Sequence, residues 1–220
     1  MSDTTLSARE TILSNIRRSL RRDEVLDSTI GEALESRLTS HPEHIQPAYE
    51  QEPLERFIEK LESVHTTVDR VSNKSELPSA IKHYFAEKDL PQTLLVSDDL
   101  VDTVDWPDSI NVENRPAEKE DTAALSSAYA AVAENGTLVL LSDKATPTSH
   151  NFLPDDHLVV VQVPKVFRYL EDVWEELRTG RGIPRAVNLI TGPSKTADVE
   201  QTIQYGAHGP RRLHVILVDE

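Results

Sequence analysis

Two stretches of this sequence carry residue types that could do chemistry. The first is Glu134-Asn135-Gly136-Thr137, a turn-forming sequence directly before the apolar run from Leu138 to Leu141. A carboxylate at such a turn can act as a nucleophile or a general base if it is partly desolvated. Glu134 is therefore the candidate catalytic residue, although the same sequence also fits a turn residue that happens to be acidic.

The second stretch is Gly192-Pro193-Ser194-Lys195-Thr196, which follows a short apolar run from Val187 to Ile190. This order predicts a strand, a glycine-containing loop and then a helix that starts at Ser194 or Thr196. The first N–H groups of a helix lack intrahelical partners, and the helix dipole is positive at that end. The sequence therefore predicts an anion site for a carboxylate or a phosphate.

Neither common nucleotide motif is present. The Gly-x4-Gly-Lys spacing of a P-loop is missing around Gly192, and no Gly-x-Gly-x-x-Gly occurs in the chain. Ser194 and Thr196 can each be explained by helix capping alone. His208, in the loop around Gly209, could donate to a ligand or titrate near neutrality, but a lone loop histidine more often has a structural role. The predicted ligand-binding residues are Gly136, Thr137, Gly192, Ser194, Lys195, Thr196, Asp198, His208 and Gly209.

Positive charge is concentrated near these residues. Arg178 to Arg212 holds six bases and two acids, a net charge of +4, inside a chain whose formal net charge is −15. A basic segment in an acidic protein suggests a docking place for an anionic ligand or an acidic partner. The alternative is that these arginines only solvate loops.

Composition excludes several classes of function. The net charge of −15 argues against general nucleic-acid binding and against adsorption to anionic lipid. The chain has no Cys, so it cannot form a disulfide, a thiolate nucleophile or a Cys-ligated iron–sulfur or zinc site. His41 and His44 have no further ligands nearby, so no metal site is predicted. With no apolar signal core and no run of transmembrane length, we expect a cytoplasmic protein without membrane insertion.

The chain divides into two predicted parts. Residues 1–52 read as a helical arm and a linker: a capping box at Ser7 to Glu10 begins one helix, a second covers Glu24 to Leu38, and a proline-containing linker follows. In residues 53–220, helical and strand patterns alternate, which predicts an α/β domain. The predicted helices begin at Pro53, around Leu77 and at Pro164, and the last of them ends at Arg178. The predicted strands are Thr66–Val71, Thr93–Val96, Leu138–Leu141, His157–Val163, Val187–Ile190 and Val215–Val218.

Three segments together resemble a known family. They are AAVAENGTLVLLSD from Ala130 to Asp143, the segment from Leu153 to Val161, and ITGPSKTADVEQTIQYGAHGPRRLHVILVD from Ile190 to Asp219. They resemble the LUD domain family and, within it, the lactate-utilisation protein C group. The turn that usually reads Glu-Thr-Gly-Thr in the family is Glu134-Asn135-Gly136-Thr137 here.

The resemblance implies a fold and a role. The expected fold is an α/β sandwich similar to the CoA-transferase and ribose-phosphate-isomerase group, with a mostly parallel sheet, plus the N-terminal helical arm. The expected role is that of an accessory subunit in L-lactate oxidation to pyruvate, beside two partner proteins. At least one partner would hold iron–sulfur clusters, and this chain would hold no cofactor. A small anionic metabolite is a possible ligand.

Two other classes of function stay open. The first is a CoA-transferase-like enzyme, in which Glu134 attacks an acyl-CoA and passes through an anhydride to a glutamyl-CoA thioester, while the basic segment holds the CoA phosphates. The second is a pure interaction protein whose N-terminal arm is the docking element.

Overall fold

The computed structural model describes residues 7–20, 28–40, 46–143, 146–180, 182–199 and 202–220. Contacts between residues divide the chain into two units, Met1–Ala48 and Tyr49–Glu220. This division lies four residues before the boundary that the sequence predicts between residues 52 and 53.

The first unit contains two helices, α1 (Ala8–Ser19) and α2 (Ser28–Thr39). The predicted capping box is present in α1: the Ser7 hydroxyl accepts the Glu10 N–H, and the Glu10 carboxylate accepts the Ser7 N–H. Each helix has a stripe of apolar side chains spaced four residues apart. These side chains are about half exposed or more, namely Ile12, Ile16 and Leu20 in the first segment and Ile30, Leu34 and Leu38 in the second.

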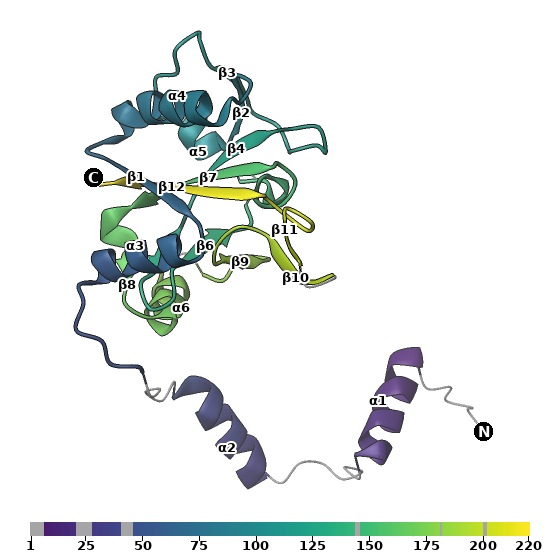
Figure 1. Cartoon of the computed structure of the whole chain (residues 1–220). Helices are drawn as coiled ribbons and strands as arrows, with labels where there is room; N and C mark the ends of the chain where they lie inside the picture. The colour runs from purple at the N-terminus through teal and green to yellow at the C-terminus, as the bar shows by residue number, and fades with distance from the viewer. Residues whose placement is uncertain (1–6, 21–27, 41–45, 144–145, 181, 200–201) are drawn as a thin grey trace. The chain divides into compact units, whose positions relative to one another are not determined.

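The second unit is built on a six-stranded sheet with the strand order β1-β12-β7-β4-β2-β3 (Figure 1). Every neighbouring pair of these strands is parallel. The strands are β1 (Thr67–Val71), β2 (Thr93–Val96), β3 (Asn111–Glu113), β4 (Ala123–Ser127), β7 (Asp156–Gln162) and β12 (Arg212–Val218). The predicted α/β fold with a mostly parallel sheet is confirmed.

Both faces of this sheet are covered, which explains the continuous apolar runs of its central strands. Alternate residues of β7 and β12 pack against α4 (Leu77–Lys88) and α5 (Asp98–Val101), in a core that includes Leu158, Val160 and Ile216. The intervening residues, such as Val159 and Val215, pack against α3 (Pro53–Ser63) and against a second sheet. Figure 1 shows α4 and α3 on opposite sides of the six strands.

The second sheet has four strands in the order β8-β5-β6-β9. They are β5 (Ala130–Val132), β6 (Thr137–Leu141), β8 (Val166–Phe167) and β9 (Val187–Ile190). The face of this sheet that is turned away from the large sheet packs on α6 (Leu170–Thr179), through Val173 and Leu177 among others. The unit therefore consists of four layers: helix, large sheet, small sheet with α3, and helix.

The prediction of one long helix from Pro164 to Arg178 is wrong in its first part. A 3-10 turn covers Val163–Lys165, and Val166 and Phe167 pair in parallel with Ala131 and Val132. The helix begins only at Leu170, where the Tyr169 N–H donates to the Asp172 carboxylate. A β-branched residue beside an aromatic one fits the free edge of β5, and this tertiary pairing overrides the helical spacing.

The predicted helix from Ser194 or Thr196 is also wrong. Lys195–Val199 form strand β10, which pairs antiparallel with β11 (Thr202–Tyr205) as a two-stranded hairpin. The Ser194 N–H donates to the Pro210 carbonyl, so this end of the segment is held by the loop before β12. No helix N-terminus stands here, and the anion site predicted from helix amides does not exist in that form.

Candidate functional site

Glu134 lies in the turn that connects β5 to β6. Its side chain is half-buried, its N–H donates to the Arg168 carbonyl, and its carbonyl accepts from Arg56 Nε. Gly136 closes the turn with a positive φ of 74°, and a Cβ at this position would lie 2.8 Å from Lys60 Cβ. Glycine is thus required here by the backbone conformation and by the close approach of α3.

A Tyr-Arg cluster, formed by Tyr49, Arg56 and Arg168, lies beside this turn. The two guanidinium groups stand against the Tyr49 ring, with Cζ to ring-centroid distances of 4.1 Å for Arg56 and 4.6 Å for Arg168. The Tyr49 hydroxyl donates to the Arg168 carbonyl at 2.9 Å. Burial is the main cause that raises the pKa of Tyr49, and the negative charge of Glu134 adds to it against the opposing effect of Arg168. The role of Glu134 as a catalytic residue stays a prediction.

Thr137, at the start of β6, contacts Thr191, which precedes Gly192 just after the end of β9. These strands are antiparallel, and the Thr137 and Thr191 hydroxyl oxygens are 2.6 Å apart. Thr137 is buried, and Gly192, with a φ of 90°, lies so close to the end of α3 that a Cβ would be 2.9 Å from a Val64 methyl group. Both residues therefore have a structural role that explains their identity, and ligand binding by them stays a prediction.

Ser194 organises the loop that leads into β12. Its hydroxyl accepts the His208 N–H at 3.3 Å, its carbonyl accepts the Gly206 N–H at 3.0 Å, and a Cβ on Gly209 would stand 3.5 Å from Ser194 Cβ. The structure thus brings together Ser194, His208 and Gly209, three of the predicted ligand-binding residues, and ligand binding by them stays a prediction. The hydroxyl binds loop backbone, in place of the helix N–H groups that the sequence predicts.

A hollow of about 800 Å³ opens beside this loop. It is lined by Gln204, Tyr205, Gly206, Ala207, Arg211 and Arg212. Lys195, which is exposed, places its Nζ 5.8 Å from the Tyr205 ring centroid, because the two residues are paired across the hairpin. Glu134 and Ser194 do not line this hollow.

Arg212 is held in the wall of the hollow by a buried carboxylate. Asp156 is fully buried and accepts from Arg212 Nε at 2.6 Å, from Arg212 Nη2 at 2.5 Å and from the Tyr84 hydroxyl at 2.8 Å. The bonds to Asp156 raise the pKa of Arg212, and burial together with Asp156 raises the pKa of Tyr84. The guanidinium therefore stays charged and fixed in orientation.

Two buried histidines lie near this end of the sheet. The ring of His214 stacks on Tyr84 at 4.3 Å between centroids, and His214 Nδ1 is 2.7 Å from the Thr67 hydroxyl. Burial lowers the pKa of His214 to about 4, although Asp69, with its carboxylate 3.6 Å from Nε2, acts in the opposite direction. Burial also lowers the pKa of His157, to about 3, so both rings are neutral at pH 7.

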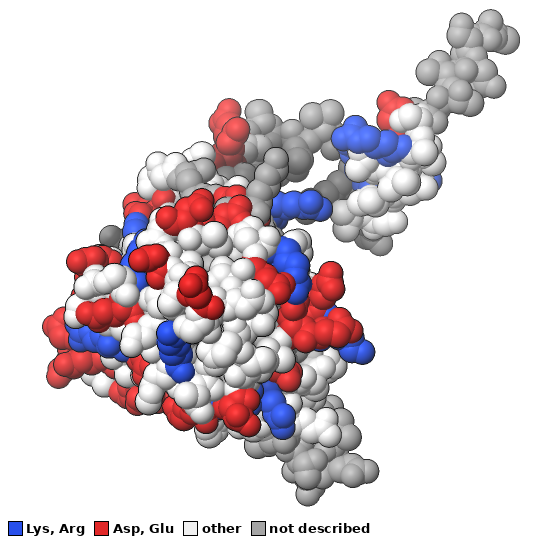
Figure 2. Space-filling view, turned by 90° about the horizontal axis from the view of Figure 1, so that it is seen from above, with Lys and Arg blue, Asp and Glu red and all other residues white. Residues whose placement is uncertain are grey.

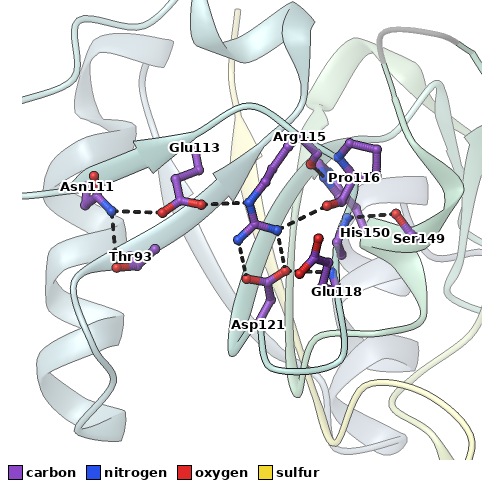
Figure 3. Close-up of polar contacts among 10 residues, drawn as sticks. Thr93, Asn111, Glu113, Arg115, Pro116, Glu118, Asp121, Ser149 and His150 are labelled. Atoms are coloured by element: carbon purple, nitrogen blue, oxygen red, sulfur yellow. Dashed lines mark hydrogen bonds and ion pairs between the residues drawn. The ribbon is translucent and has the colours of Figure 1, made fainter.

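A second polar network stabilises the loop between β3 and β4 (Figure 3). Arg115 binds both carboxylate oxygens of Asp121, at 2.8 and 2.7 Å, and donates through Nε to Glu113 at 2.8 Å. The Arg115 carbonyl lies 2.7 Å from Nε2 of the buried His150, so the loop is also tied to the segment before β7. These contacts hold the loop in place. The sequence assigns no functional role to the residues that form them.

The predicted site residues thus lie in three adjoining parts of the chain, which are linked through the contact between Thr137 and Thr191. Ser194, Lys195, His208 and Gly209 lie on the hairpin and its loop, Thr137 at the start of β6 with Gly192 just after β9, and Glu134 and Gly136 at the turn beside α3. Thr196 lies half-buried in β10, while the side chain of Asp198 lies outside the described part of the chain. Sequence reasoning missed Tyr205 and Asp156. A carboxylate directly before an apolar strand was the available signal for Asp156.

Charge is unevenly distributed over the described surface. Five aspartates between residues 98 and 108 are exposed, and acidic side chains outnumber basic ones on the face seen in Figure 2. Within the described ranges, no group of three or more His, Asp or Glu side chains is arranged to hold a metal ion. No helix among the residues with described positions is long and apolar enough to cross a membrane.

The fold defines an α/β protein with a parallel central sheet, and comparisons identify its family. The sequence profile of the LUD domain matches residues 54–218, and the chain belongs to this family. A solved structure of a DUF162 family protein from Deinococcus radiodurans has a TM-score of 0.58 and 22% identity, covering 78% of this chain and 99% of that one. That likeness supports the fold.

Curated relatives extend the similarity over the whole chain. "Lactate utilization protein C" of Exiguobacterium sp. is 27% identical over all of both chains. The protein of the same name from Oceanobacillus iheyensis is 26% identical over 88% of this chain and 95% of its own. An uncharacterised protein from Neisseria meningitidis is 37% identical over 44% of this chain and 42% of its own.

Proposed function

We propose that this chain serves in lactate utilisation, as an accessory subunit of an iron–sulfur system that oxidises L-lactate to pyruvate. The observation that supports this most directly is the alignment with "Lactate utilization protein C" of Exiguobacterium sp., which spans both chains from end to end, arm included. Membership of the LUD domain family over residues 54–218 agrees with it.

The chemistry of the chain limits what this subunit contributes. A chain without Cys has no thiolates for an iron–sulfur cluster, so the clusters would be held by partner proteins. We propose two such partners, at least one of which carries clusters. The contribution of this chain would be assembly and the binding of a small anion at the basic hairpin.

A gene deletion tests the role. We expect a strain without this chain to lose growth on L-lactate as the carbon source, to grow normally on a carbon source that bypasses lactate, and to recover with the intact gene. The same strain should accumulate no pyruvate from added L-lactate. Normal growth on L-lactate after the deletion would contradict the proposal.

Co-purification tests the assembly separately. A tagged full-length chain isolated from lactate-grown cells should bring down Cys-containing partners with the visible absorption of iron–sulfur clusters. A variant with the apolar stripe of α1 replaced, Ile12→Ser with Ile16→Ser, tells whether the arm makes the contact. A tagged chain recovered alone would contradict the subunit role.

A further inference from the structure

The hollow beside the β10–β11 hairpin is lined by one cation held by a buried carboxylate and by a second, exposed cation. Arg212 uses Nε and one N–H of Nη2 to bind Asp156. A guanidinium has five N–H donors, so donors that do not bind Asp156 remain on a residue that lines the hollow. Because Asp156 is fully buried and also binds Tyr84, the guanidinium cannot turn away, and its donors are preorganised.

Arg211, the neighbour of Arg212 in the sequence, also lines the hollow. It is exposed, and within the described part of the chain it has no acidic partner. The Arg211 stem rests on Gly206, where a Cβ would approach Arg211 Cβ to 3.0 Å and where φ is 81°. A glycine is therefore required for this arrangement on two grounds, and it keeps Arg211 beside Arg212 at the edge of the hollow.

An aromatic side chain also lines the hollow, and a third cation lies near that side chain. Tyr205 is 38% exposed. Lys195 Nζ lies 5.8 Å from the centroid of its ring, and the His65 ring is edge-on at 6.0 Å between centroids. Counting Arg211, Arg212 and Lys195 against the buried Asp156, these groups have a net charge of +2 within a chain of −15. Such local excess of positive charge attracts anions.

The volume of the hollow limits the size of the ligand that it would fit. A volume of about 800 Å³ lies in the range of about 300–1,000 Å³ that is usual for small-molecule sites. A three-carbon acid would leave most of this space to water. Paired guanidinium groups match the oxygens of a carboxylate or a phosphate.

We propose that this hollow binds a small organic anion that is larger than lactate, through a carboxylate or phosphate group held between Arg211 and Arg212. The inference deepens the ligand-binding part of the proposed function and assigns it to residues of the hollow. Tyr205 supplies a flat contact for the remainder of the ligand, and Lys195 supplies charge at the rim. Asp156 and Tyr84 act as positioning residues, since they reach the ligand only through Arg212.

Titration of the purified full-length chain tests the site, with citrate as the carboxylate probe, pyrophosphate as the phosphate probe and L-lactate as the small comparator, all at constant ionic strength. We expect citrate or pyrophosphate to bind saturably and more tightly than L-lactate by calorimetry. In ¹H–¹⁵N NMR spectra, the bound probe should shift the amide signals of Gly206 and Ala207 and the Arg212 Nε–H signal. The stronger probe identifies the acid group.

Single substitutions distinguish specific binding in the hollow from non-specific attraction of anions to the basic segment. Arg211→Ala should weaken binding of the stronger probe by about tenfold, which is the effect of losing one charge-assisted contact. Arg185→Ala is the matched control, because Arg185 is exposed and belongs to the same basic segment but does not line the hollow. Tyr84→Phe should weaken binding less than Arg211→Ala, and it should reduce the shift that the bound probe causes in the Arg212 Nε–H signal, which a merely structural role would leave unchanged.

Three outcomes would overturn the inference: no saturable shift with citrate or pyrophosphate, an equal loss of binding in Arg185→Ala and Arg211→Ala, or binding of L-lactate as tight as that of both larger probes. None of these depends on growth. If the purified chain binds the probe but its gene deletion leaves growth on L-lactate intact, the lactate role is contradicted and the site stands. If the deletion abolishes growth on L-lactate but the chain binds no probe, only the site is contradicted.

Discussion

Two arginine–aspartate pairs of the second unit each have two hydrogen bonds, but the pairs lie in different surroundings. Arg212 donates two hydrogen bonds to Asp156, of 2.6 and 2.5 Å. Arg115 donates two hydrogen bonds to Asp121, of 2.8 and 2.7 Å. Asp156 is 0% exposed and takes its third bond from a tyrosine in α4, whereas Asp121 is 12% exposed and takes its third from the Glu118 N–H of its own loop.

The two pairs should differ in how much stability is lost when the bonds to the carboxylate are removed. A buried carboxylate without its partners cannot be rescued by water, whereas a partly exposed one can. The inner pair therefore joins α4 to β7 and β12, and the outer pair closes a loop. The following experiments test this contrast, in order of decreasing expected effect.

The largest effect is expected for Asp156→Asn. This change removes the charge but keeps the shape, and it leaves Arg212 partly buried without a counter-ion. The free energy of unfolding should fall by about 4 kcal/mol, as when one partner of a buried ion pair is removed. Denaturant titration at pH 7 measures it. A loss below about 1 kcal/mol would mean that the pair is as replaceable as a surface pair.

Acid should destabilise the same region through His214. Its pKa is lowered from 6.5 to about 4 in the folded chain, so the unfolded state binds more protons between these values. Stability is therefore complete above pH 6.5 and falls as the pH decreases toward 4, by on the order of 3 kcal/mol.

Unfolding measured between about pH 7 and about pH 4.5 gives this slope. His214→Gln should flatten it, while His83→Gln on the exposed side of α4 is the control. His157, with its pKa lowered to about 3, acts in the same direction and should leave part of the slope in the His214 variant. Identical slopes in the wild type and His214→Gln would contradict the assignment.

Asp121→Asn should have a smaller effect. It weakens the bonds to Arg115 and to the Glu118 N–H, but both groups can turn to water. We expect a decrease in Tm that is roughly a third of the decrease for Asp156→Asn. Thermal unfolding followed by circular dichroism compares the two variants directly, and equal decreases would remove the distinction between the pairs.

The smallest expected effect is that of salt on the difference in stability between the Asp121→Asn and Asp156→Asn variants. Raising the ionic strength from about 0.1 M to about 1 M shortens the screening length from about 10 Å to about 3 Å. The penalty of Asp121→Asn should shrink more than that of Asp156→Asn, because the Asp156 carboxylate is fully buried whereas Asp121 is partly exposed. Both penalties are measured by denaturant unfolding at the two salt concentrations.

Much of the fold could be predicted because its segments follow a local rule. The continuous apolar run His157–Val163 indicates a strand covered on both faces, and β7 lies inside the large sheet as expected. Phe57 and Leu61 at helical spacing after Pro53 predict α3, and both are buried. The family could also be named from the segments around Glu134, Leu153 and Gly192, because those residue strings are specific by themselves.

The site could be predicted only in part. The sequence assigns Ser194, His208 and Gly209 to one place, and their loop brings them together. The local structure predicted for that place is wrong: the expected helix N-terminus is a hairpin, since Lys195 and Thr196 pair with Tyr205 and Gln204. Such a pairing is stabilised by contacts made elsewhere in the chain, which local spacing does not contain.

The sequence by itself determined the α/β class, the family, the excess of acid and the basic segment near the C-terminus, because these depend on residue type and local period. Only the tertiary structure decided which cations face one hollow and which acid is buried beneath them. Asp156 and Arg212 stand 56 residues apart and meet because β7 and β12 are neighbours in register. Partners of that kind are chosen by the packing of the sheet and leave no local trace.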